Sequence, residues 1–349
     1  MNMEVSTVLG SRSSDWKRRL VTTPALFSLA VGSLVVAPVL VPVAAIWDLT
    51  QNNRWSACRT LVFLPFFFWF EVLGLAVLFW LWLRHVAGMS SEAFLEANHR
   101  MQAWWVGGVF ALVRRVYSIQ LDVEGHGELN DPSPTVILSR HASTLDTLLP
   151  LALNRTETRF RYVLKAELLF DPALDYCGQR LPNAFVRRGS GNPEKEVARV
   201  VALGEDLGSG EAVVLFPEGT RFSVSRRRRL LEKFETDPVM GPVIALLQHT
   251  LPPLREGAVQ LLAHTAAADV VFIAHRGLER ARTMSDLIGG GLTGAHLEVC
   301  IWRVPAAEIP RDPESLRDFL LTQWRKVDRY VSERSLAISS TSSGEVSPL

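Results

Sequence analysis

The sequence predicts an α/β fold: a mixed, largely parallel sheet flanked by helices and preceded by an N-terminal hydrophobic helical hairpin. Hydrophobic residues make up 48% of the 349 residues, and they are concentrated in two runs near the N-terminus. Beyond residue 118, short β-rich runs alternate with helical patterns, which is typical of α/β domains. The length fits one domain of ordinary size plus an additional segment.

Residues 24–84 are predicted to form a membrane helical hairpin. Residues 20–47 carry no charge, and residues 60–83 carry only Glu71, whose role the sequence leaves open. Each run is longer than the ~20 residues that a helix needs to cross the hydrocarbon core of a bilayer. The alternative is a pair of helices buried in a large soluble core, but uncharged runs of this length are rare there. The sequence therefore favours a membrane protein.

The charges around the two runs predict which way the hairpin faces. A basic cluster at residues 17–19 precedes the first run, and Arg84 follows the second. Basic residues are enriched on the cytoplasmic side of membranes. We therefore expect the N-terminal segment 1–23, both ends of the hairpin and the domain that follows to face the cytoplasm. Pro38 and Pro42 predict a kink in the first helix.

Residues 85–118 have a mixed helical pattern, in which Trp104, Trp105 and Phe110 alternate with arginines. Two interpretations remain open. The helix could lie on the membrane surface with its apolar face toward the lipid. It could equally pack that face on the core of the following domain.

The region 119–336 is predicted to be the folded domain, and the Ser-rich stretch 337–349 is predicted to be a disordered tail. The expected strands are Ile119–Glu124, Thr135–Ser139, Phe160–Lys165, Asn183–Arg187, Ala212–Phe216, Val270–Ala274 and His296–Val304. The expected helices are Thr144–Leu153, Pro193–Leu207, Gly257–Thr265 and Pro313–Ser335.

Cysteines and net charge restrict the class of protein. Cys58, Cys177 and Cys300 are far apart and form no CxxC pair, which argues against a disulfide framework and against a zinc site. The net charge of +1 is uninformative about nucleic acid. The run Arg226–Arg229 suits anionic lipid, nucleic acid or a solvated helix face. Because the hairpin places the chain at a membrane, we expect no nucleic-acid partner.

The strongest site candidate follows the second expected strand. The carboxyl edge of an open α/β sheet is where ligands bind, and His141 lies there, just before a helix start. Asp146, one turn further, can accept a hydrogen bond from one ring nitrogen and leave the other nitrogen as a base. The alternative is that Asp146 only closes a helix capping box with Ser143.

Two further segments carry basic residues out of the sheet. In Phe216-Pro217-Glu218-Gly219-Thr220-Arg221, proline and glycine predict a turn that exposes Glu218 and Arg221. Arg221 offers a planar fork that suits a phosphate. Phe185-Val186-Arg187-Arg188-Gly189 brings arginines close to a helix start at Asn192, which is a plausible anion site. Each segment could also be an ordinary charged surface turn.

Together these segments resemble the first three sequence blocks of the glycerolipid acyltransferase family, which includes 1-acylglycerol-3-phosphate acyltransferases. The matching residues are His141-x4-Asp146, Phe185-Val186-x-Arg188 and Phe216-Pro217-Glu218-Gly219-Thr220-Arg221. Their order and spacing match as well, over residues 123–304, and the third block matches in full.

The resemblance implies an activity. His141 would be the general base that removes the proton of an acceptor hydroxyl, Asp146 would orient it, and the hydroxyl oxygen would attack an acyl thioester directly. The donor would be acyl-CoA or acyl carrier protein, and the acceptor a membrane lysophospholipid, with lysophosphatidic acid giving phosphatidic acid. No cofactor and no metal ion are implied, and the oligomeric state is not indicated. The implied substrate-binding residues are Arg188, Glu218, Gly219, Thr220 and Arg221.

Some positions depart from the family pattern and keep alternatives open. Arg140 stands where the family usually has asparagine, and Pro182 where it usually has glycine. Residues 251–258 resemble a segment of the lysocardiolipin-acyltransferase-like branch, so another lysophospholipid could be the acceptor. A non-catalytic membrane protein with a degenerate domain is a second alternative. A lipid hydrolase using Ser143 is a third, although the sequence has no G-x-S-x-G turn.

Overall fold

A computed structural model describes residues 12–187, 191–238, 240–253 and 256–342 of the chain. In this part of the chain the core is a seven-stranded sheet in the order β1-β7-β6-β2-β5-β3-β4. Only the β6–β7 pair is antiparallel, so the predicted mixed, largely parallel sheet is confirmed. The strands are β1 (Gln120–Glu124), β2 (Thr135–Ser139), β3 (Arg159–Lys165), β4 (Ala184–Val186), β5 (Glu211–Leu215), β6 (Asp269–Arg276) and β7 (His296–Val304).

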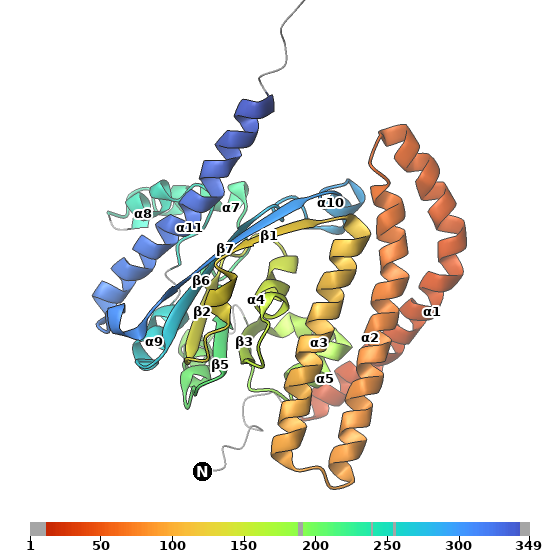
Figure 1. The fold of residues 1–349 in the computed structure, drawn as a ribbon, viewed down its shortest axis with the longest axis horizontal. Helices are drawn as coiled ribbons and strands as arrows, with labels where there is room; N and C mark the ends of the chain where they lie inside the picture. The colour runs from red at the N-terminus through yellow and green to blue at the C-terminus, as the bar shows by residue number, and fades with distance from the viewer. Residues whose placement is uncertain (1–11, 188–190, 239, 254–255, 343–349) are drawn as a thin grey trace, which may run out of the picture.

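Helices cover both faces of the sheet (Figure 1). On one face, α3 (Ser91–Tyr117) and α4 (Leu149–Leu153) pack on the side chains that include Ile137. On the other face, α9 (Glu256–His264) and α11 (Pro313–Ser342) pack on side chains that include Val136 and Leu138, the residues on either side of Ile137 in β2. This alternation follows from the two-residue repeat of a strand, and both faces of the central strands are buried because parallel sheets are covered on both sides.

The boundaries of several helices differ from the prediction. The expected helix 144–153 is a 3₁₀ turn, Leu145–Leu148, followed by α4, because Pro150 has no N–H to extend a longer α-helix. The helix expected over 193–207 is shorter: α6 ends at Val201 and a 3₁₀ turn follows. The sequence analysis did not predict the short helices α5 (Pro172–Gly178), α7 (Val224–Lys233), α8 (Met240–Leu246) and α10 (Met284–Ile288).

The first and last long helices of the domain, α3 and α11, bear on two of the predictions. α3 buries Trp105, Val109 and Val113 in the core of the domain, which favours the second of its two interpretations. α11 continues to Ser342, past residue 337, where the disordered tail is predicted to begin. Residues 343–349 lie outside the described part.

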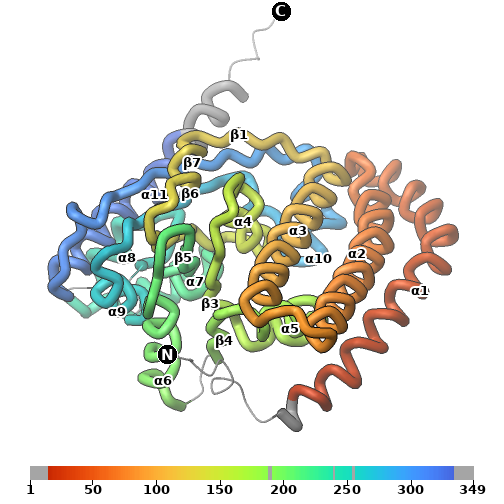
Figure 2. The backbone as a smooth tube through the Cα atoms, turned by 60° about the horizontal axis from the view of Figure 1, so that its bottom comes forward, coloured from red at the N-terminus to blue at the C-terminus, as the bar shows by residue number. Residues whose placement is uncertain are grey.

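The N-terminal hairpin consists of α1 (Arg12–Gln51) and α2 (Ser56–Val86), which pack side by side next to α3 (Figures 1 and 2). Both are long and apolar enough to cross a membrane, and only 11% and 28% of their most apolar stretches are buried. Their outer surfaces are therefore available to lipid. α1 begins well before residue 24, where the hairpin was predicted to start, and it bends along a path that contains Pro38 and Pro42.

The hairpin is attached to the sheet-containing domain at both of its ends. Near the start of α1, Arg18 and Arg19 donate to the buried carboxylate of Asp175 in α5, at 2.8 and 3.1 Å. At the tip, Asn53 Nδ2 donates to the carbonyl of Ile288, at 2.7 Å. The Ser56 hydroxyl donates to the Thr293 hydroxyl, at 2.8 Å. The hairpin therefore lies along the domain, and its tip does not extend away from it.

Glu71 of α2 faces the protein. The residue is 1% exposed, and its electrostatic neighbours are Trp105 of α3 and Asp171, the N-cap of α5. Burial raises the pKa of Asp171. A carboxyl group in an otherwise apolar helix is thus accommodated by polar neighbours across a helix contact.

Replacement of Asp175 by asparagine is expected to loosen the start of α1. Arg18 and Arg19 would lose their charged acceptor, and a hydrogen bond to a charged group contributes about 1.5–3 kcal/mol. Hydrogen–deuterium exchange of the purified protein should show faster exchange in the first turns of α1. The matched control is Asp122→Asn, which removes a 69% exposed carboxylate paired with His296. Unchanged exchange in α1 would contradict the attachment.

Candidate active site

His141 and Asp146 form a hydrogen-bonded pair at the carboxyl edge of the sheet. β2 ends at Ser139, and two residues later the ring Nδ1 of His141 lies 2.8 Å from Asp146 Oδ1. Asp146 is fully buried, while His141 is 8% exposed. A carboxylate can only accept, so Nδ1 carries the proton and Nε2 of the neutral imidazole keeps its lone pair. The pair therefore presents a base of defined tautomer.

The Asp146 carboxylate is held by its own turn of chain. Its Oδ2 accepts the backbone N–H groups of Ala142 and Ser143, each at 2.6 Å. The complete capping box does not form: the Ser143 hydroxyl accepts from the backbone N–H of Leu145, at 3.3 Å, and donates to the carbonyl of Ala281. Burial raises the pKa of Asp146, but hydrogen bonds from His141 and His275 outweigh burial and leave the pKa well below its ordinary value. Asp146 is thus ionised at neutral pH.

His275 is a buried neighbour of the pair that sequence reasoning did not find. Its Nε2 lies 3.0 Å from the carbonyl of Arg140 and 3.5 Å from Asp146 Oδ2, so this nitrogen is the donor. β2 and β6 run parallel with Ser139 opposite Ile273, and this register brings residue 275 alongside residue 141. The signal was present only as a histidine near the end of a predicted strand.

Arg140, the departure from the family pattern, points away from the His141 ring. Its guanidinium is buried and donates to the carbonyls of His275, at 2.7 Å, and His249, at 3.0 Å. It also pairs with Glu279 at 2.5 Å. Arg140 therefore ties the loops around the sheet edge together and leaves the His141–Asp146 pair intact.

Glu218 corrects the prediction that its side chain is exposed. The turn after β5 places Gly219 at φ +66, and the preceding Glu218 points inward with 2% exposure. Its Oε1 accepts the backbone N–H of His141 at 2.9 Å, and its Oε2 accepts that of Leu251 at 2.8 Å. Burial raises the pKa of Glu218 to about 8 against these hydrogen bonds. Glu218 thus shapes the site by holding the backbone of His141.

Arg221 lies beside the pair, as its sequence block suggested. The backbone N–H of Phe222 donates to the carbonyl of His141 at 2.7 Å, which fixes this loop next to the base. Arg221 Nη1 donates to the Thr144 hydroxyl at 2.9 Å and to the Arg282 carbonyl at 3.2 Å. The guanidinium is only partly buried, so its remaining N–H groups can bind an anion. Thr220, next to it, is also partly buried.

The remaining basic candidates lie around this edge. Arg188 lies outside the described residues; Arg187 before it is exposed and follows β4, a parallel strand that ends at the same edge of the sheet. The predicted Arg226–Arg229 run lies in α7. Arg226 donates to the carbonyl of Arg221 at 2.8 Å, and Arg228 and Arg229 are exposed. In the described part of the chain, no group of three or more His, Cys, Asp or Glu side chains could hold a metal ion.

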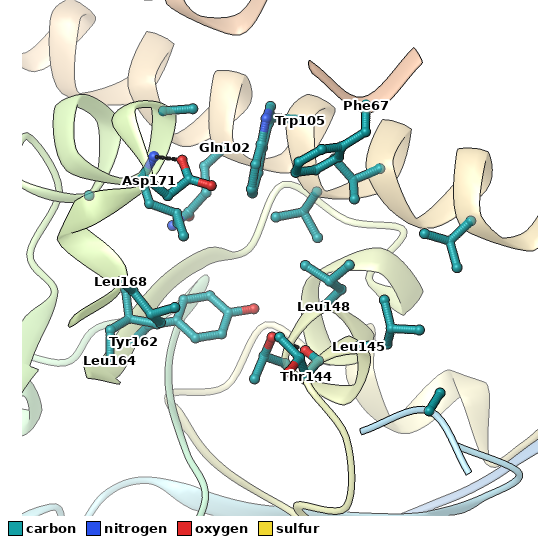
Figure 3. Close-up of a pocket in the computed structure, with 18 of the residues that line it drawn as sticks. Phe67, Gln102, Trp105, Thr144, Leu145, Leu148, Tyr162, Leu164, Leu168 and Asp171 are labelled. Carbon is teal, nitrogen blue, oxygen red and sulfur yellow. Dashed lines mark hydrogen bonds between the residues drawn. The ribbon is translucent and has the colours of Figure 1, made fainter. Parts of the chain in front are cut away.

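A largely apolar cavity of about 460 Å³ adjoins the Arg221 loop (Figure 3). Phe67 of α2 and Trp105 of α3 form one wall, and Leu164 and Tyr162 of the sheet form another. Thr144, which binds Arg221, is also part of the lining. This cavity was not predicted from the sequence, because its walls come from five separate segments of the chain.

The region of the chain that contains these residues is similar to known proteins. Residues 120–270 match the family model described as Acyltransferase. The 1-acyl-sn-glycerol-3-phosphate acyltransferase epsilon of Mus musculus is 22% identical over 268 residues, which cover 72% of this chain and 72% of the mouse protein.

Two proteins of Pseudomonas aeruginosa match over shorter regions. Its lyso-ornithine lipid O-acyltransferase is 28% identical over 148 residues, 42% of this chain and 51% of that protein. Its 1-acyl-sn-glycerol-3-phosphate acyltransferase is 31% identical over 123 residues, 35% of this chain and 46% of that protein. Each of these matches spans about half of the bacterial protein.

The fold matches the crystal structure of the 1-acyl-sn-glycerophosphate (LPA) acyltransferase PlsC from Thermotoga maritima. The TM-score is 0.53 at 14% identity, and the match covers 81% of this chain and 99% of that chain. This likeness supports the fold, and the family model covers the strands that carry His141, Asp146 and Arg221. The family-model match and the 1-acyl-sn-glycerol-3-phosphate acyltransferases among the relatives therefore support a glycerolipid acyltransferase domain over residues 120–270.

Proposed function

We propose that this protein transfers a fatty acyl group from acyl-CoA or acyl carrier protein to the free hydroxyl of lysophosphatidic acid, which gives phosphatidic acid. The observation that carries the proposal is the His141–Asp146 pair, 2.8 Å apart, with an unprotonated Nε2 and with the Arg221 loop hydrogen-bonded to the backbone of His141. A base, an anion site and an apolar cavity are the three features that this reaction requires.

The proposed reaction is a direct transfer without an acyl-enzyme. Nε2 of His141 takes the proton of the acceptor hydroxyl while its oxygen attacks the thioester carbonyl. The new C–O bond forms, the C–S bond breaks, and the imidazolium returns the proton to the departing thiolate. The Asp146 carboxylate stabilises the imidazolium in between. Proton transfer of this kind contributes about 10²–10⁴ in rate, and alignment of the two substrates contributes more.

The surroundings assign each substrate a place. Arg221 binds the acceptor's phosphate through its planar N–H groups. The cavity lined by Phe67 and Trp105 takes the acyl chain of the donor. Because Thr144 both lines the cavity and binds Arg221, the two sites are adjacent and the reacting groups meet near His141.

Of the three alternative functions, one remains a candidate, and structural observations argue against the other two. A lysophospholipid other than lysophosphatidic acid remains the second candidate, and a relative named for lyso-ornithine lipid favours testing it. A hydrolase would need a free nucleophile, but the Ser143 hydroxyl is buried and donates to Ala281. A degenerate domain is disfavoured because Asp146 keeps donors to both of its oxygens.

We further propose that the hairpin lies in the cytoplasmic leaflet with the catalytic domain facing the cytoplasm. Contacts at both the base and the tip of the hairpin support an arrangement along one surface, because a crossing hairpin would carry its tip to the opposite side. Exposed Trp47 and Trp55 at the tip suit the interface between lipid and water.

His141→Ala is expected to lower kcat by about 10²–10⁴ while membrane association stays unchanged, because only the base is lost. The assay is acyl transfer from acyl-CoA to lysophosphatidic acid by the purified protein. His264→Ala, which removes an exposed ring that contacts Gln260, is the matched control. Near-normal turnover by His141→Ala would end the assignment of the base.

Arg221→Ala is expected to raise the KM for lysophosphatidic acid about tenfold or more, since a hydrogen bond to a charged group is lost. Transfer to a monoacylglycerol, which has no phosphate, should change little. Arg228→Ala serves as the control, because the Arg228 side chain is exposed and pairs with Glu232 within α7. Equal losses with both acceptors would contradict a phosphate contact.

Cysteines placed at Gln51, the last residue of α1 at the tip of the hairpin, and at Ala87, just after α2, should react with a membrane-impermeant maleimide from the same side of the membrane. The background lacks Cys58, Cys177 and Cys300. We expect both positions to be labelled in inverted vesicles, where the cytoplasmic face is outside, and protected in right-side-out vesicles. Labelling of the two positions from opposite sides would show that the hairpin crosses the bilayer.

A further inference from the structure

The cavity contains a polar atom that the proposed reaction does not use. Tyr162 of β3 is 5% exposed, and its hydroxyl is buried without a hydrogen-bond partner. Figure 3 shows the phenol reaching from β3 into the space between Trp105 and Leu148. Among the described residues that line the cavity, no other buried side-chain oxygen lacks a partner.

The other hydroxyls of the lining are already engaged. The Thr144 hydroxyl accepts from Arg221 at 2.9 Å, and the Thr147 hydroxyl donates to the Thr144 carbonyl at 2.6 Å. The Tyr117 hydroxyl donates to Thr60 at 3.2 Å. Among the buried hydroxyl groups of the described lining, that of Tyr162 therefore differs in having a proton that no partner accepts.

The chemistry of the phenol makes it a donor at any physiological pH. Burial raises the pKa of Tyr162, and the nearby backbone N–H of Leu151 only partly offsets this effect. That N–H can serve the phenol oxygen, so the group that the phenol lacks is an acceptor for its proton. A water molecule would find few further polar partners here, because the hydroxyl faces the space between Leu148 and Trp105 in a largely apolar lining.

The position of Tyr162 in the sheet places its phenol beside the middle of an acyl chain whose thioester lies at His141. Tyr162 lies beside Val214 of β5, and Val214 lies beside Ile137 of β2. All three belong to the core on the α3 side of the sheet. Ile137 precedes His141 by four residues, which corresponds to roughly 13 Å along a strand at ~3.3 Å per residue. An acyl chain with its thioester at His141 would pass Tyr162 well away from its carbonyl end.

We propose that the cavity selects acyl donors that carry a hydroxyl or keto oxygen along the chain, with the Tyr162 phenol donating a hydrogen bond to that oxygen. This inference rests on the proposed acyl transfer and on the cavity as the site of the acyl chain. An unpaired buried hydroxyl is costly, and a matching oxygen on the substrate removes that cost while a plain methylene chain does not.

The test compares octadecanoyl-CoA with the positional isomers of hydroxyoctadecanoyl-CoA, using the full-length protein and lysophosphatidic acid. At least one isomer should have a kcat/KM about tenfold above that of the plain chain, the size expected of one neutral hydrogen bond. Tyr162→Phe should bring the ratio of hydroxylated to plain chain close to one. No preferred isomer, or a preference that survives in Tyr162→Phe, would overturn the proposal.

Tyr117→Phe is the matched control, because it also removes a buried hydroxyl from the same cavity, but one that already has a partner. The hydroxyl-chain preference should persist in this variant, and its loss would show that any change in the lining abolishes discrimination.

A binding measurement separates this inference from the proposed reaction. Octadecanoic acid and its hydroxy isomers should displace a fluorescent fatty acid from the cavity of the His141→Ala protein, with the preferred isomer displacing it at about tenfold lower concentration. Adding Tyr162→Phe should remove the difference. If transfer fails with every donor but this difference holds, the reaction is wrong and the cavity's selectivity stands; equal displacement by all acids would refute the selectivity.

Discussion

The active site depends on keeping one buried carboxylate charged. Asp146 has no solvent exposure, and a buried charge without partners would be too costly to persist. Two backbone N–H groups at 2.6 Å occupy Oδ2, and the ring of His141 occupies Oδ1. Both backbone donors come from the turn between His141 and Asp146. The spacing of five positions therefore has a physical cause: a shorter or longer turn could not wrap the carboxylate back onto the imidazole while satisfying its second oxygen.

The sequence was sufficient to predict the sheet and the His141–Asp146 pair, because both are encoded locally. Short apolar runs indicate the strands. The carboxyl ends of parallel strands lie at one edge of the sheet, so the residues that follow them are brought together there. Glu218 and His275 could not be placed in this way. Glu218 is directed inward by the left-handed backbone at Gly219 and accepts from Leu251, which lies 33 positions further along the chain. His275 reaches Asp146 only through the register of β2 with β6. Such contacts leave no periodic signal in the sequence.

The hairpin shows a similar division between local and long-range information. Its apolar runs were evident from composition, but the sequence could not show that Arg18 and Arg19 bind Asp175 or that the tip binds the loop at Ile288. The basic residues at 17–19 have two roles to satisfy. Their charge suits the cytoplasmic side of a membrane, and Arg18 and Arg19 also bind Asp175. A charge count alone records only the first. The position of the hairpin along the domain is therefore a property of tertiary packing.

Membrane attachment and substrate recognition share the same helices. Phe67 of α2 and Trp105 of α3 face the cavity, while the outer surface of the same hairpin is apolar and exposed. The polar contact of Glu71 with Trp105 and Asp171 lies between these two surfaces, at the packing of α2 on α3 and α5. A change in how α2 packs on α3 must then alter the shape of the cavity, because the same side chains form both. The proposed acyl-chain selectivity is thus tied to the packing of α2 on α3 and to the Tyr162 phenol, which faces these helices from the sheet.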